Sequence, residues 1–345
     1  MTPSKSWLYG LRLESSTLVK QIFKSIHNRD LNTARAKQIV ASYLQGKEYY
    51  KNAEKADISV KPLLLFYGVS SLSRCITLLL NPFKGEEALK KGHGLTTENW
   101  ANILSSNVED GLLKIGDLKV TSCNGLFWDL INATNNISYL HVRSSGVDFS
   151  VLNEAPTLNA SLKFEDVTAR VPDLRSEYEL WTGKESDNTP VNSLITKGNR
   201  FEMKLLDNSK IDSIFSTKKG VLTFENQGNL KVIKGDFEHM PMLINTFVNK
   251  TFDSIPSLFV AKVLDGFGEI AQIPLTYVHS YFLGMLCRYF PSHWMALTRG
   301  NIGDSVWPLI QSSMNYVEKS YPELIMEYIQ EVTKQGIERS NITED

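Results

Sequence analysis

Apolar and polar residues follow different periods in three parts of the chain, and each period indicates a type of secondary structure. In the first part, apolar and small side chains recur at gaps of four and three residues, which places them on one helix face. These residues are Ile39, Tyr43, Gly46, Tyr50 and Ala53. The pattern predicts a long helix there, with Asp30 as its N-cap.

The next segment is apolar on nearly all sides, which predicts a central core helix. We expect it to begin at Lys61-Pro62, because proline fits the first turn of a helix, and to end at Asn81-Pro82. The segment is also long enough to span a bilayer, but Arg74 inside the membrane would cost about 2.5–3.5 kcal/mol. The prediction is therefore a buried helix of a soluble protein that has no membrane partner.

Between residues 113 and 273 the period shortens to the alternation that is typical of strands. Two turn sequences in this part predict β-hairpins. The first is 226–229, and the second is 265–268, whose Asp-Gly pair suits turns with positive φ. The strands that flank the second turn are expected at 257–263 and 269–273.

Helices are expected again after this strand-rich part. A long apolar helix over 275–290 ends at Pro291, because proline disrupts the interior of a helix. Pro322 is expected to separate the last two helices, over 306–321 and 322–334. Shorter helices are expected earlier in the chain, over 98–104, 164–170 and 174–182.

These elements predict an α+β fold in which the N- and C-terminal segments form one helical bundle and a β-rich module is inserted between them. We place the segments at 1–112, 113–273 and 274–345. Residues 1–110 carry 15 basic and 10 acidic side chains, whereas residues 274–345 carry 5 and 8. The opposite net charges of the two ends suit their packing against each other.

The composition of the 345-residue chain excludes several classes of protein. Its 37 Lys plus Arg balance 38 Asp plus Glu, which argues against a polybasic nucleic-acid binder, and 42% hydrophobic residues argue against a disordered chain. The three cysteines are far apart and form no CxxC pair, so neither a disulfide framework nor a zinc site is expected. No secretory signal is visible, so we expect a cytoplasmic protein. The common nucleotide, metalloprotease and hydrolase motifs are missing, so the sequence predicts neither a metal nor a cofactor.

Several strings stand out by their order and spacing. They are KPLLLFYG at 61–68, SLSR at 71–74, GHGL at 92–95, VPDL at 171–174 with Tyr178, and RYFP at 288–291 with Trp294. Together they resemble the strings of YaaC-like bacterial proteins. The resemblance covers about 34–299 and implies a cytoplasmic bacterial protein of mixed fold, without implying any chemistry. Together with the missing catalytic motifs, it favours a protein that acts mainly through interaction. We therefore expect a subunit or sensor of a bacterial complex, such as a defence complex, with a protein partner or a second copy of the chain.

A first alternative is a metal-independent ribonuclease, because Arg288 and His293 have the Arg-x4-His spacing of HEPN ribonucleases. Histidine can exchange the protons of RNA cleavage, and arginine can stabilise the charged phosphate in the transition state. However, Pro291 between them is expected to break the helix, and Tyr289 replaces the small polar residue of that motif. Purely structural roles for both side chains are the competing interpretation. Whether the protein is an enzyme therefore stays open.

A second alternative is a nucleotide or phosphate-ligand binder that uses Tyr67, Arg74 and His93. His93 lies between two glycines, which let a ligand approach the backbone closely, and a helix N-terminus expected near Thr97 would favour an anion. If two arginines, Arg74 among them, converge with His93 in the bundle, they would form an anion or phosphate pocket, which RNA or a nucleotide could occupy. The competing interpretations are a histidine that fixes a tight turn and an arginine buried for structural reasons.

Overall fold

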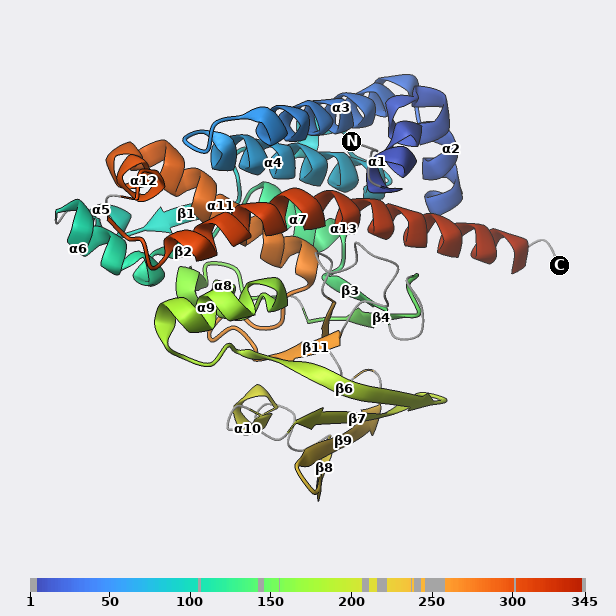
Figure 1. The fold of residues 1–345 in the computed structure, drawn as a ribbon. Helices are drawn as coiled ribbons and strands as arrows, with labels where there is room; N and C mark the ends of the chain where they lie inside the picture. Colours follow the sequence, from blue (N-terminus) through green and yellow to red (C-terminus); the bar gives the residue numbers. More distant parts are fainter. Residues whose placement is uncertain are drawn as a thin grey trace.

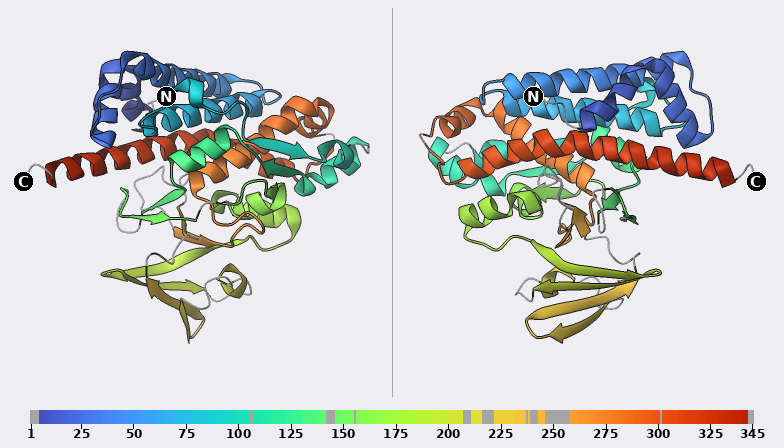
Figure 2. Two further views of the ribbon diagram at one scale, coloured as in Figure 1. Left: turned by 180° about the vertical axis from the view of Figure 1, so that it is seen from behind. Right: turned by 45° about the vertical axis from the view of Figure 1, so that its right-hand side comes forward.

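The computed structural model describes most of the chain, with several gaps in its middle part. The described residues are 5–104, 107–141, 146–154, 156–206, 211–215, 222–236, 238, 243–245, 258–300 and 302–342. Long helices from both ends of the chain form one layer, and a β-rich region lies beneath it (Figures 1 and 2). This arrangement confirms the predicted α+β class and the pairing of the two helical ends.

The helices of the N-terminal part follow the predicted pattern closely. They are α1 (Lys5–Gly10), the 3-10 turn η1 (Leu11–Glu14), α2 (Ser16–His27), α3 (Thr33–Lys55) and α4 (Lys61–Leu80), followed by η2 (Glu86–Ala88). The five residues predicted to share one face of α3 are all buried. The predicted N-cap is wrong, because Asn32 accepts the Arg35 amide at 2.9 Å, whereas Asp30 instead pairs with Lys24.

Helix α4 is the centre of the helical layer, as predicted. It packs against α3 on one side and against α11 (Gln272–Tyr289) on another, where a Cβ on Gly284 would lie only 2.7 Å from the Cβ of Phe66. Among the described residues it is the one helix long and apolar enough to cross a membrane. Because 67% of that apolar stretch is buried within the fold, it fits a core helix of a soluble protein.

The C-terminal part consists of α11, α12 (Pro291–Thr298) and α13 (Trp307–Ile342). The predicted break at Pro291 is confirmed, whereas the predicted break at Pro322 is wrong, because α13 continues through it. Apolar side chains on both sides of Pro322 are buried in the same core, so packing outweighs the hydrogen bond that proline cannot make. An ion pair between Lys61 and Glu318, 2.7 Å long, joins the two ends of the chain.

The described residues of the middle part form three antiparallel sheets. The first contains β1 (Leu95–Glu98), β2 (Lys119–Ser122) and β5 (Ser161–Lys163), and the second pairs β3 (Ile137–Leu140) with β4 (Phe149–Leu152). The third sheet has the strand order β10-β11-β6-β7-β9-β8. Its strands are β6 (Asn188–Lys197), β7 (Arg200–Leu206), β8 (Thr223–Gln227), β9 (Leu230–Asp236), β10 (Leu243–Asn245) and β11 (Leu258–Ala261). Short helices lie between the strands: α5 (Trp100–Ile103), α6 (Val108–Leu113), η3 (Ile115–Asp117), α7 (Leu126–Ala133), α8 (Phe164–Ala169), η4 (Pro172–Leu174), α9 (Arg175–Thr182) and α10 (Ile211–Ile214).

One of the two predicted hairpins is present. Strands β8 and β9 pair so that Gln227 lies opposite Leu230, which leaves a two-residue turn at Gly228 and Asn229. The second hairpin is wrong, because β11 pairs with β6 and β10 rather than with a strand at 269–273. Its turn closes only one isolated bridge between Leu264 and Gly268, after which the chain enters α11. The predicted strand also included Ser257, which lies outside the described residues.

The buried apolar residues form two clusters. The larger one joins helices from both ends of the chain with β1, β2, β5 and the short helices α7 and α8. The smaller one lies under the six-stranded sheet and includes Leu140 and Val151 from β3 and β4. All three predicted segments contribute to the larger cluster, so the proposed boundaries at 113 and 274 do not separate independent cores.

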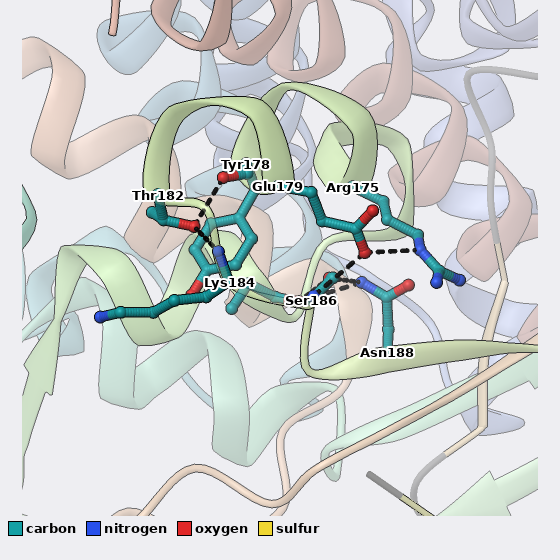
Figure 3. Close-up of polar contacts among 8 residues, drawn as sticks. Arg175, Tyr178, Glu179, Thr182, Lys184, Ser186 and Asn188 are labelled. Carbon is teal, nitrogen blue, oxygen red and sulfur yellow. Dashed lines mark hydrogen bonds and ion pairs between the residues drawn. The ribbon is translucent and has the colours of Figure 1, made fainter. Parts of the chain in front are cut away.

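Polar contacts connect α9 to the beginning of β6, where the chain passes from the larger cluster to the six-stranded sheet (Figure 3). The Glu179 carboxylate accepts hydrogen bonds from Arg175 Nε at 3.0 Å and from the Ser186 amide at 3.1 Å. Asn188 Nδ2 in turn donates to Ser186 Oγ at 2.6 Å. These bonds satisfy the polar groups of Ser186 and Asn188, which are buried at this junction.

A fully buried histidine, His279 on α11, has neither ring nitrogen hydrogen-bonded. Its ring stacks on Phe164 at 5.7 Å and touches the edge of Tyr316. Burial lowers the pKa of His279 to about 3, because a charged imidazole would lose its hydration without gaining a partner. The histidine is therefore a polar group that the core tolerates at a cost.

We predict that His279→Leu raises the free energy of unfolding by about 1 kcal/mol at pH 7.5, because the substitution removes unsatisfied buried polar atoms. In the unfolded chain this histidine gains a proton below its ordinary pKa of about 6.5, whereas in the folded chain it stays neutral until the pH falls to about 3. The natural protein therefore loses free energy of unfolding as the pH falls from 6.5 to 3. The His279→Leu variant should lose less free energy of unfolding over the same range. Urea unfolding at pH 7.5 and pH 5 measures both effects.

The matched control is His27→Leu, which removes a ring whose nitrogen contacts the Leu79 carbonyl at 2.9 Å. This variant should lose stability at pH 7.5, since it leaves that carbonyl without a partner. A destabilised His279→Leu protein with an unchanged pH dependence would contradict the prediction.

Candidate functional site

Three of the elements described above meet around the turn 92–94. The backbone of this turn is held against the start of α7, because the Gly92 and His93 carbonyls accept the amides of Leu126 and Phe127 at 3.1 and 3.0 Å. The His93 carbonyl also accepts a hydrogen bond from the Tyr277 hydroxyl of α11 at 2.9 Å. The backbone of residue 93 therefore fixes the turn, which leaves its side chain available for other contacts.

Glycine is required at this turn. Gly94 has a φ of +79°, and a Cβ on it would lie 2.7 Å from the Phe127 amide nitrogen. Strand β1 follows directly, so the helix N-terminus expected near Thr97 is absent and that prediction is wrong. The first amides of α7 cannot replace it as an anion site, because they already bond the carbonyls of the turn.

The His93 ring is half-buried among aromatic side chains. It meets the Phe66 ring edge-on at 4.9 Å and the Tyr281 ring at 6.2 Å. Burial lowers the pKa of His93, and the positive charges of Arg288 and Arg74 lower it further, so the ring is neutral at pH 7. The imidazole forms no hydrogen bond with any residue that the structure describes.

Arg288 and Arg74 are both exposed, and their guanidinium groups lie near His93. Arg288, on the last turn of α11, donates from Nη1 to the Tyr67 hydroxyl at 3.1 Å. Arg74 lies on α4, seven residues after Tyr67 and therefore on the same helix side. Neither arginine forms an ion pair with an acidic side chain in the described part of the chain.

The structure thus brings together the three residues predicted to bind a ligand, Tyr67, Arg74 and His93, and adds Arg288 to them. We call these four residues the arginine–histidine surface. It presents two uncompensated positive charges, a neutral histidine that can become charged, and a phenol already oriented by one of the arginines. Such a set favours a ligand with two or more negative charges.

The second residue of the predicted ribonuclease pair, His293, lies in different surroundings. Helix α11 ends at Tyr289 and α12 begins at Pro291, so the pair is split between two helices. His293 is only 6% exposed and packs against Phe290 and Gly111. Burial lowers the pKa of His293, although the Leu104 backbone nearby raises it in part. A catalytic role for Arg288 and His293 stays a prediction, which RNA cleavage in EDTA by the natural protein and by His293→Ala would test.

A family model described as YaaC-like Protein matches residues 12–329. The chain belongs to the YaaC-like family. No curated protein and no solved structure matches it. The family assignment thus confirms the resemblance inferred from the sequence strings, and it leaves the function to be inferred from the structure.

Most of the strings that resemble the YaaC-like family meet at the arginine–histidine surface. KPLLLFYG contains Tyr67, SLSR contains Arg74, GHGL contains His93, and RYFP contains Arg288. The remaining string, VPDL, forms η4 before α9 and lies apart from them in the sequence. The strings are therefore far apart along the chain but close together in the fold, as the parts of one site would be.

Sequence reasoning did not identify the tyrosines that position this site. Tyr277 and Tyr281 hold the carbonyls of His93 and Leu95 at 2.9 and 3.0 Å. A signal was present, because Tyr277, Tyr281, Gly284 and Arg288 follow gaps of four, three and four, which is one helix face. No group of three or more His, Cys, Asp or Glu in the described part of the chain could hold a metal ion.

We predict that Gly94→Ala lowers the melting temperature far more than Gly92→Ala. Both glycines have positive φ, so each alanine adds backbone strain of about 1 kcal/mol, but only the Cβ at Gly94 collides with the backbone of α7. Nothing lies within 4 Å of the Cβ that would be added at Gly92. Thermal unfolding of both variants measures the difference, and equal losses would show that the turn does not depend on this close approach.

Proposed function

We propose that the arginine–histidine surface binds a phosphate-bearing ligand and that the protein acts as a binding or sensing subunit. The observation that supports this function is the convergence of two exposed, unpaired arginines on a histidine without a hydrogen-bond partner among the described residues. A dianion at this surface is attracted by both positive charges. Guanidinium groups also match phosphate oxygens in geometry.

The site joins parts of the chain that are distant in sequence, which fits a sensing role. Tyr67 and Arg74 belong to α4, His93 to the following turn, and Arg288 to α11. A ligand that binds all three elements stabilises their contact, because binding to the folded state adds RT ln(1 + [L]/Kd) to the free energy of unfolding. At a ligand concentration of 100 Kd this is about 2.7 kcal/mol. The proposal includes a protein partner, or a second copy of the chain, that binds differently to the ligand-stabilised protein.

We expect pyrophosphate to raise the melting temperature of the full chain and to bind with a measurable heat. Arg74→Gln and Arg288→Gln should each weaken binding by about tenfold, which corresponds to roughly 1.4 kcal/mol, within the range for charge-assisted hydrogen bonds. Thermal shift and calorimetric titration at low salt measure both effects.

The control is Arg200→Gln, which removes an exposed arginine of β7, in the six-stranded sheet. This variant should bind pyrophosphate as the natural protein does. If the three variants lose affinity equally, binding is a general charge effect, and if the natural protein binds no pyrophosphate, the proposed function is wrong.

Binding should also strengthen as the pH falls from 8 to 5. The pKa of His93 is lowered in the free protein, so the ring gains its charge only under acidic conditions, and a bound anion favours the charged form. Sulfate is a suitable probe because its own charge does not change over this range. We expect about a fivefold gain in sulfate affinity, equivalent to roughly 1 kcal/mol for one added charge near the surface. His93→Gln should abolish the gain, and His27→Gln, which removes another histidine of lowered pKa, should retain it.

A further inference from the structure

Aromatic side chains border the arginine–histidine surface on two sides. Tyr289, which follows Arg288 at the end of α11, is 57% exposed. The Arg288 guanidinium lies over its ring, 5.0 Å from the ring centre. On the other side, the rings of Tyr67 and Tyr49 lie 5.5 Å apart at an angle of 33°. The positive charges are thus accompanied by flat apolar groups.

Tyr289 is the ring that remains open to a ligand. The Tyr67 ring is half-buried, packs against Tyr49, and has its hydroxyl engaged by Arg288. Within the described ranges, the Arg288 guanidinium is the one group over the Tyr289 ring, and more than half of the surface of Tyr289 is in contact with solvent. Burial raises the pKa of Tyr281, and the Tyr289 phenol raises it further, while the Tyr281 ring itself packs on His93.

A large aromatic ring in water beside a phosphate site suggests a ligand with both an anion and a flat ring. Stacking of a nucleobase on an aromatic side chain contributes about 1–3 kcal/mol and works with every base. Guanidinium groups stack on bases as well. An inorganic anion or a phosphorylated serine side chain has no flat ring that could stack on Tyr289.

We propose that the ligand of the arginine–histidine surface is a nucleotide unit, whose base stacks on the open face of Tyr289 while its phosphates lie between Arg74, Arg288 and His93. This inference rests on the proposed function and makes it more specific. The nucleotide unit can belong to a free nucleotide or to the end of an RNA strand, since both present the same base and phosphate.

The test compares adenosine triphosphate with inorganic tripolyphosphate, which carries similar charge but no base, in titrations of the full chain. The nucleotide should bind about tenfold more tightly. Tyr289→Leu should reduce this ratio to nearly one, whereas Tyr289→Phe, which keeps the ring, should preserve it. Adenosine monophosphate and a short oligoribonucleotide then distinguish the two sources, because an RNA site favours the oligoribonucleotide and a free-nucleotide site does not.

The matched control is Phe83→Leu. Phe83 is 73% exposed and has the Arg29 guanidinium over its ring at 4.9 Å, so it repeats the arginine–aromatic pair away from the four-residue surface. This variant should leave the ratio at its natural value. If the natural protein binds both compounds equally, or if Tyr289→Leu keeps the tenfold ratio, the nucleotide inference is overturned while phosphate binding stands. If neither compound binds, the proposed function itself fails.

Discussion

The hydroxyl groups of buried tyrosines hold the parts of this fold in register. Tyr277 and Tyr281 lie one turn apart on α11 and donate hydrogen bonds to the carbonyls of His93 and Leu95. The His93 carbonyl also accepts the Phe127 amide, so hydrogen bonds from both α7 and α11 favour one position of the turn. Because these bonds hold the turn, the His93 ring stays where the positive charges of Arg288 and Arg74 act on it. The arginine–histidine surface therefore depends on contacts made in the core beneath it.

The same chemistry fixes the long helix α13. The Tyr321 hydroxyl lies 2.5 Å from Ser73 Oγ on α4, and the Tyr328 hydroxyl donates to the Thr134 carbonyl at the end of α7 at 2.8 Å. Each tyrosine buries a ring in the apolar core and satisfies one polar atom of a distant segment. These bonds lie on both sides of Pro322 and are only seven residues apart, so they hold α13 along one line through the proline. The composition shows many aromatic residues, but only the fold shows this use of them.

Local patterns predicted the elements that local forces decide. The face of α3, the start of α4 at Lys61-Pro62 and the turn between β8 and β9 follow from side-chain spacing and backbone preference, so they were predictable. The strand at 269–273 was not, because the partner of β11 is β6, which lies some seventy residues earlier. Likewise, the sequence alone did not decide whether Arg74, His93 and Arg288 lie close together, because several arrangements were compatible with it. The contacts that produce it are tertiary, and no spacing along the chain encodes them.

Arg288 and His293 show why closeness in sequence is a poor guide to this site. Pro291 ends one helix and begins another, so the two side chains leave the backbone in different directions. His293 enters the packing beside Gly111 of α6, whereas Arg288 reaches Tyr67 on α4, which is more than two hundred residues away in sequence. The arginine thus lies among the rings of Tyr67 and Tyr289, near the histidine of the turn, His93, and away from its sequence neighbour His293.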